Sequence, residues 1–181
     1  MPKVHTLTAA KDYPDHGIAK GDTYYKWSLR PGGRGKGTTY RSKTPPKPSQ
    51  LTSSPFLKEM HDIQDRIDGL TLVVEKIYND IEIESAIADV QSEIEAICDD
   101  IDALSEQPQE SLDNMPESLQ AGPTGELLQG RVDECESWQS ELESAKDNAP
   151  DRDDDQSDED YLDAVQSWLD DEVKCCTYNG E

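Results

Sequence analysis

Aromatic and other apolar side chains are scarce in this chain of 181 residues. Hydrophobic residues make up 33% of it and aromatic residues 6%, with a single Phe. This content is low for a globular domain, and it excludes a large multilayered core. No apolar run approaches the roughly 18 residues that a membrane span needs, and the first residues lack the apolar core of a signal peptide. We therefore expect a soluble, cytoplasmic protein that has no membrane partner.

The patterns of common catalytic and metal sites are also missing. The four cysteines form no C-x-x-C pair, and the three histidines share no ligand spacing. No EF-hand loop, phosphate-binding glycine loop or nucleophile motif is present. The carboxylates are numerous, but none stands alone in the apolar setting that acid–base catalysis needs. We expect neither an enzyme nor a site for a metal or another cofactor.

The cysteines have no obvious chemical role. Cys98 and Cys135 fall on or beside apolar helical stripes, which favours small buried hydrophobes in a reducing compartment over a disulfide framework. Cys175 and Cys176 are adjacent at the end of the chain. We expect idle thiols there, with a strained disulfide or binding of a thiophile as the alternatives.

Charge is abundant and unevenly distributed. The chain carries a net charge of −23, yet residues 1–50 hold ten Lys or Arg against three Asp, a net charge of +7. Residues 51–181 therefore carry −30. A basic head precedes a strongly acidic body, and the two parts should attract partners of opposite charge.

These shifts in composition predict a mainly α protein that begins with a small β-hairpin. A coiled-coil or helical-hairpin body and a flexible acidic tail follow. The predicted segments are a basic β-hairpin module at 1–44, a proline-rich linker at 45–55, an acidic coiled-coil or helical body at 56–145, a disordered acidic linker at 146–160, a short amphipathic helix at 161–174 and a tail at 175–181.

The basic head is predicted to form two strands, 23–30 and 38–43, around a glycine-rich turn. Period-two alternation predicts one aromatic face formed by Tyr25, Trp27, Leu29 and Tyr40. The opposite face is cationic and suits phosphate groups, with one tyrosine to stack on a base or sugar. The residues expected to contact DNA or RNA are Tyr24, Lys26, Arg30, Arg34, Lys36, Arg41 and Lys43. Contact with a protein, contact with the chain itself and simple solvation remain open.

The head carries two resemblances. The run Tyr-Tyr-x-Trp from residue 24, with the later Gly-Gly and Tyr-Arg-Ser-Lys, resembles the arm-binding hairpin of phage-type tyrosine integrases, which grips DNA with a small sheet. Residues 20–27 and 42–52, together with 111–116 and 125–128, resemble a group of uncharacterised small phage and prophage proteins that pair a basic start with an acidic helical remainder. The second resemblance implies a phage-encoded protein in the host cytoplasm and no particular activity.

The acidic body carries two apolar stripes with the alternating spacing of three and four that is typical of coiled coils. The first comprises Met60, Ile63, Ile67, Leu70, Val74, Ile77 and Ile81, and the second Ile83, Ile87, Val90, Ile94, Ile97, Ile101 and Leu104. The register is lost between Ile81 and Ile83, so we expect a break, kink or hairpin near 78–80. A helix cannot bury such a stripe alone. We therefore assign these residues, except Ile81 and Ile83, to homo-oligomerisation, with pairing to later segments as the alternative.

The second half of the body reads as a loop and a further helix. Residues 105–125 contain three Pro and two Gly and predict a loop. Helicity resumes with Thr124 as a cap, and a stripe from Leu128 to Ala145 predicts a helix packed antiparallel against 83–104, with Trp138 as its largest buried group. The amphipathic helix at 161–174 should dock on the body or in a partner's groove.

Taken together, the residues and the resemblances favour a non-enzymatic phage accessory protein. Its basic hairpin would bind DNA or RNA while the acidic body self-associates or recruits a host protein. In one alternative the body mimics DNA and acts as a decoy for a host nucleic-acid-binding or defence protein. In the other, the chain is a structural oligomer in which head and body pair through their opposite charges.

Overall fold

The computed structural model describes residues 2–30, 36–73 and 80–180, without the side chains of 80–82, and its chain divides into two compact units. The N-terminal unit is Met1–Asp62 and the C-terminal unit is Ile63–Glu181. The first holds eleven Lys or Arg and five Asp or Glu, and the second holds six and 35. The net charge thus changes from +6 to −29 at the structural boundary. The predicted mainly α fold with a small N-terminal β element is confirmed.

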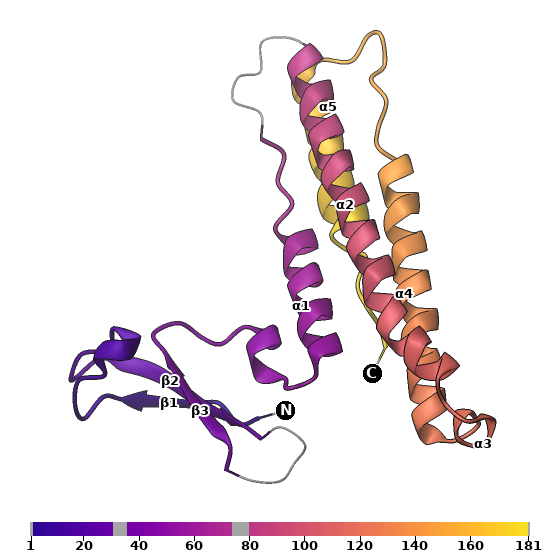
Figure 1. Ribbon diagram of the computed structural model, residues 1–181. Coiled ribbons are helices and arrows are strands. Elements are labelled where there is room, and N and C mark those ends of the chain that lie inside the picture. The colour runs from indigo at the N-terminus through magenta and orange to yellow at the C-terminus, as the bar shows by residue number, and fades with distance from the viewer. Residues whose placement is uncertain (1, 31–35, 74–79, 181) are drawn as a thin grey trace. The chain divides into compact units, whose positions relative to one another are not determined.

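A three-stranded antiparallel sheet in the order β1-β2-β3 forms the base of the N-terminal unit (Figure 1). The strands are β1 (His5–Thr8), β2 (Thr23–Leu29) and β3 (Thr38–Ser42). The predicted hairpin is the β2–β3 pair. Strand β1 was not predicted, although Val4, Thr6 and Thr8 are β-branched, as residues in strands often are.

The connection between β1 and β2 covers part of one face of the sheet. Ala9, Ile18 and Tyr24 form a small buried cluster, and Tyr13 packs against it. The short 3-10 turn η1 (Pro14–His16) ends at Gly17, whose φ of 62° is a conformation that glycine adopts without strain. This cover gives the small sheet a core of its own on that face.

The opposite face of the sheet carries the proline-rich segment. Trp27 stacks on Tyr40 with 5.7 Å between the ring centroids, which is the aromatic pairing that the alternation predicted. The indole Nε1–H of Trp27 donates to the carbonyl oxygen of Gln50 at 3.0 Å. Gln50 belongs to the 3-10 turn η3 (Pro48–Leu51). Part of the expected linker at 45–55 is therefore bound to the sheet.

The C-terminal unit is built on an antiparallel pair of helices, α2 (Asp80–Asp113) and α4 (Pro123–Asp147), joined through the short α3 (Glu117–Gln120) (Figure 1). The predicted pairing of the second and third helices is confirmed, and Trp138 is 1% exposed. The structure corrects the ends of both helices. Helix α2 continues to Asp113, so the expected loop at 105–125 is too long. Helix α4 is capped by Gly122, which leaves Thr124 inside the first turn and not at the cap.

Pro108 explains why α2 was predicted too short. Proline usually ends a helix because it lacks an N–H and its ring crowds the preceding turn. Here Pro108 is buried four residues after Leu104 and four before Leu112, on the same buried side of α2. Its ring continues the apolar stripe, which offsets the loss of one backbone hydrogen bond.

The described residues of the two predicted stripes are buried within the chain. Helix α1 (Pro55–Asp68) carries Met60, Ile63 and Ile67 of the first stripe, and α2 carries the second. The stripe residues that are no more than 8% exposed are Met60, Ile63, Ile67, Leu70, Ile83, Ile87, Val90, Ile94, Ile97, Ile101 and Leu104. One chain already buries these residues, which favours the alternative in which the stripes pair with other segments of the same chain over homo-oligomerisation.

The expected break between the stripes lies between the end of α1 and the start of α2. Helix α1 ends at Asp68 and α2 begins at Asp80, so residues 56–104 do not form one continuous helix. Val74, Ile77 and residues 78–79 lie outside the described residues, and so does the side chain of Ile81.

The amphipathic C-terminal segment docks on the helical pair. It comprises α5 (Asp158–Trp168) and the π-turn η4 (Leu169–Val173), and its buried side chains include Val165 and Trp168. The indole Nε1–H of Trp168 donates to the carbonyl oxygen of Ala145 on α4 at 2.7 Å. Of the two docking sites predicted for this segment, the structure shows the one on the body.

The acidic stretch expected as a disordered linker at 146–160 has defined structure at both ends. Helix α4 runs to Asp147, and α5 begins at Asp158 with Ser157 as its cap. Between them, Arg152 pairs with Asp158 at 2.5 Å, and the Tyr161 hydroxyl donates to the carbonyl oxygen of Pro150 at 3.2 Å. One arginine and one tyrosine thus hold a segment that its acidic composition alone would leave mobile.

Candidate nucleic-acid interface

A row made of a lysine, an arginine and a histidine crosses the sheet of the N-terminal unit. His5 on β1 lies opposite Lys26 on β2, and Lys26 lies opposite Arg41 on β3. Directly opposed residues share a face of the sheet, so the three side chains line up across three adjacent strands. His5 is exposed, while Lys26 and Arg41 are half-buried. We call these three residues the cationic row.

Arg30 and Lys36 extend the positive charge toward the end of the β2–β3 hairpin, where both are exposed. Arg30 follows β2 directly, and its stem lies against the backbone of Gly37. A Cβ at Gly37 would lie 2.8 Å from Arg30 Cγ and 2.8 Å from the carbonyl oxygen of Leu29. A glycine is therefore needed at 37 for the arginine stem to take this path.

Arg41 is held in place by an aromatic ring. Its guanidinium carbon lies 4.8 Å from the centroid of the Tyr13 ring, and Nζ of Lys11 lies 5.6 Å from the same centroid. Both distances are in the range of cation–π contacts. Arg41 Nε is buried and has no hydrogen-bond partner within the part of the chain that the structure describes. Tyr13, in the loop between β1 and β2, therefore contacts Arg41 of the row and brings Lys11 close to it.

Tyr24 is not available as a stacking residue. It is 5% exposed, and its ring lies 5.7 Å from that of Tyr13 at an interplanar angle of 48°. Burial raises the pKa of the Tyr24 hydroxyl and the hydrogen bond with Tyr13 raises it further, while Arg41 opposes both. The predicted role in base stacking is wrong because the covering loop was not foreseen. Tyr24 supports Tyr13, which in turn supports Arg41.

Lys43 is already paired within the unit. Its Nζ lies 2.9 Å from Oδ2 of Asp22, and the backbone N–H of Ala19 donates to the same oxygen at 3.0 Å. The hydrogen bond from Lys43, followed by that from Ala19, holds the pKa of Asp22 below its usual value. A phosphate would have to compete with this carboxylate, so we expect Lys43 to contribute less than the cationic row.

Of the seven predicted contact residues, the structure pairs Lys26 with Arg41 across β2 and β3, places Arg30 directly after β2, and leaves Lys36 exposed before β3. Arg34 lies outside the described residues. The sequence analysis missed His5 and Lys11. The β-branched residues Val4, Thr6 and Thr8 could have indicated a strand that includes His5, but no local signal places Lys11 beside Tyr13.

The arrangement suits the binding of an anion. Among the residues that the structure describes, no group of three or more His, Cys, Asp or Glu side chains could hold a metal ion. None of the described helices has both the length and the apolar character needed to cross a membrane. No family model, no curated protein and no solved structure matches this chain.

Proposed function

We propose that the N-terminal unit binds DNA or RNA through the cationic row together with Arg30 and Lys36. The acidic C-terminal unit then serves as a body that recruits a host protein, in a phage-encoded, non-enzymatic accessory protein of the host cytoplasm. The observation that carries this proposal is that most of the basic residues lie in one structural unit, the one that contains the sheet. All but six of the seventeen Lys and Arg residues lie in the unit that contains the sheet.

The geometry of the row suits a phosphate backbone. Adjacent strands lie about 4.8 Å apart, so side chains on three strands span about 10 Å. Such a row can neutralise neighbouring phosphates, which gives affinity without reading the bases. The described contacts with Tyr13 fix Arg41 before any ligand arrives, which reduces the entropy lost on binding.

The test is fluorescence anisotropy with labelled duplex DNA, single-stranded DNA and RNA of equal length. The double variant Lys26→Gln/Arg41→Gln removes two charges of the row. We expect it to bind at least about tenfold more weakly, since one charge-assisted contact contributes about 1.5–3 kcal/mol.

The matched control is Lys58→Gln, which removes an exposed charge from α1 in the same unit. It should change affinity by less than about twofold because rim charges far from a contact contribute little. Absence of binding to all three nucleic acids at low salt would contradict the proposal. So would an equal loss in the control and the double variant.

A second candidate function is mimicry of a nucleic acid by the C-terminal unit. Four of its six basic side chains, Arg66, Lys146, Arg152 and Lys174, already pair with carboxylates of the same unit. With 35 Asp or Glu in the unit, a large excess of carboxylates is left to face solvent. This excess could occupy the DNA-binding surface of a basic protein.

The double variant Lys26→Gln/Arg41→Gln separates the two candidates. It should bind DNA at least about tenfold more weakly, but it keeps the acidic unit intact. If it still displaces labelled duplex from a basic protein such as a histone octamer, mimicry is supported. Failure to displace the duplex at low salt would rule out mimicry of this kind.

A further inference from the structure

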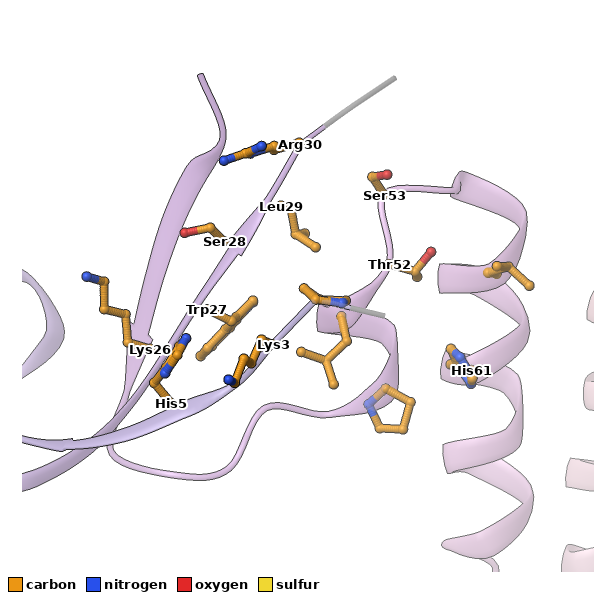
Figure 2. A pocket seen from close by; sticks show the side chains of 14 residues that line it. Lys3, His5, Lys26, Trp27, Ser28, Leu29, Arg30, Thr52, Ser53 and His61 are labelled. Atoms are coloured by element: carbon orange, nitrogen blue, oxygen red, sulfur yellow. The ribbon is translucent and has the colours of Figure 1, made fainter. Parts of the chain in front are cut away.

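A hollow of about 700 Å³ lies within the N-terminal unit, beside the aromatic face of the sheet (Figure 2). Residues from the N-terminal segment, β2, the segment from η3 onward and the first turns of α1 line it. Its volume is in the range of about 300–1,000 Å³ that small-molecule sites occupy. The cationic row accounts for only part of this lining, so the hollow needs an explanation of its own.

Polar and basic residues make up more than half of the lining, and apolar side chains form the remaining walls. They include Trp27, Leu29, Leu51 and Leu57. Figure 2 shows Leu29 pointing toward Thr52, whereas Lys26, Ser28 and Arg30 point to the other side of the strand. Trp27 is fixed by its stacking on Tyr40 and its hydrogen bond to Gln50, so this wall is formed before a ligand binds.

Polar groups in the lining favour an anion. Lys3 and His61 supply nitrogen donors, and Thr52 and Ser53 supply hydroxyl groups. None of the described residues that line the hollow is an Asp or Glu. In a unit that holds five carboxylates, their absence from this surface removes the repulsion that an anionic ligand would otherwise meet.

We propose that this hollow binds a nucleoside 5′-monophosphate, either as the free nucleotide or as the 5′ end of a single strand. The base lies against the apolar wall formed by Leu29, Leu51 and Leu57, and the phosphate lies near Lys3 and His61. The assignment rests on the proposed function, because a nucleotide is the expected anion only if the unit handles nucleic acid. It adds a second site, which shares His5 and Lys26 with the cationic row.

Isothermal titration calorimetry on the full chain tests the assignment. Adenosine 5′-monophosphate should bind at least about tenfold more tightly than adenosine or inorganic phosphate, since each of these lacks half of the predicted contacts. Ser53→Trp places a large ring at an exposed position of the lining and should abolish binding. Lys3→Gln/His61→Gln should weaken binding at least about tenfold, while the control Lys58→Gln should leave it unchanged.

A second titration distinguishes the two sources of the nucleotide. A single strand with a 5′-phosphate that binds more tightly than the same strand with a 5′-hydroxyl, with the difference lost in Ser53→Trp, identifies the strand end. Equal binding of the two strands, with adenosine 5′-monophosphate still bound, identifies the free nucleotide. Binding of neither ligand, or binding that survives Ser53→Trp, overturns the assignment.

Arg41→Gln keeps this test separate from that of the proposed function, because Arg41 does not line the hollow. We expect it to weaken duplex binding and to leave the binding of adenosine 5′-monophosphate unchanged. If the chain binds duplex but no nucleotide, the hollow is not a nucleotide site and the proposed function stands. If it binds neither, both proposals fail.

Discussion

At the scale of single residues, burial determines which cysteines can react. Cys98, Cys135 and Cys176 are buried, and desolvation raises the pKa of each thiol to about 11. Cys175 is exposed, and all four are free. The structure thus agrees with the predicted role of Cys98 and Cys135 as small hydrophobes. It also shows that the two adjacent cysteines at the end of the chain differ in exposure, since Cys175 is exposed and Cys176 is buried.

This burial predicts a single reactive thiol at pH 8. A thiol whose pKa is about 11 is ionised in only about one molecule in a thousand at that pH, and the thiolate is the reactive form. Labelling with a thiol-specific reagent, followed by mass spectrometry, should modify Cys175 alone in the native chain and all four cysteines in denaturant. Cys175→Ser should remove the fast reaction. Rapid native labelling of Cys98 or Cys135 would contradict the described core.

Asp22 gives a prediction about pH. Its pKa is held below the usual value, chiefly by Lys43, so the folded state keeps this carboxylate charged to lower pH than the unfolded chain does. The stability that it contributes is present above the usual Asp pKa and is lost as the pH falls through the lowered one. In an NMR titration, the Asp22 carboxyl should titrate below the ordinary Asp range. Lys43→Gln should shift the midpoint upward, and an unchanged midpoint would contradict the pairing.

At the scale of elements, the turn between α3 and α4 depends on one glycine. A Cβ at Gly125 would lie 1.9 Å from the carbonyl oxygen of Gln120, whereas one at Gly130, on the same helix, would meet nothing within 4 Å. Gly125→Ala therefore forces the backbone of α4 away from the backbone at Gln120, the last residue of α3.

We expect Gly125→Ala to lower the free energy of unfolding by about 1–3 kcal/mol. Gly130→Ala should raise it by up to about 1 kcal/mol, because alanine favours a helix more than glycine does. Urea unfolding followed by circular dichroism measures both. Equal effects of the two substitutions would show that the turn is not packed as described.

Elements with strong periodicity were predictable, and those that depend on tertiary contacts were not. Spacings of three and four identified both stripes, the helix around Trp138 and the C-terminal amphipathic segment. Strand β1 is short, and its pairing with β2 cannot be read from four residues. Helix α2 continues through Pro108 only because the proline ring is buried. The acidic segment between α4 and α5 is ordered by the contacts of Arg152 and Tyr161, which its composition does not reveal.

At the scale of the whole molecule, the division of charge was visible in the sequence, and the structure places the boundary at residues 62 and 63. The faces of the hairpin were also predictable, because alternation alone separates Trp27 and Tyr40 from Lys26 and Arg41. The loop that covers Tyr24 was not predictable, because no local sequence pattern indicates that residues 9–22 fold back on the sheet. The partner of the heptad stripes was not predictable for a similar reason, since the spacing shows only that a stripe needs a partner and does not show which segment or which copy of the chain provides it.

The burial of both stripes within one chain predicts a monomer. Light scattering during size-exclusion chromatography should give the mass of a single chain, about 20.2 kDa, at both low and high salt. A dimer or larger species at both salt concentrations would restore oligomerisation through apolar surfaces. A larger mass at low salt alone would support charge pairing between the basic unit of one copy and the acidic unit of another.

The salt dependence of nucleic-acid binding tests the central claim most directly. Four Lys or Arg side chains at the proposed surface, each neutralising one phosphate, predict that the logarithm of the duplex association constant falls with the logarithm of salt concentration at a slope of about −3 to −4. Lys26→Gln/Arg41→Gln should make this slope shallower by about two. Binding that does not depend on salt, or a double variant that keeps the original slope, would contradict a cationic row that binds phosphates.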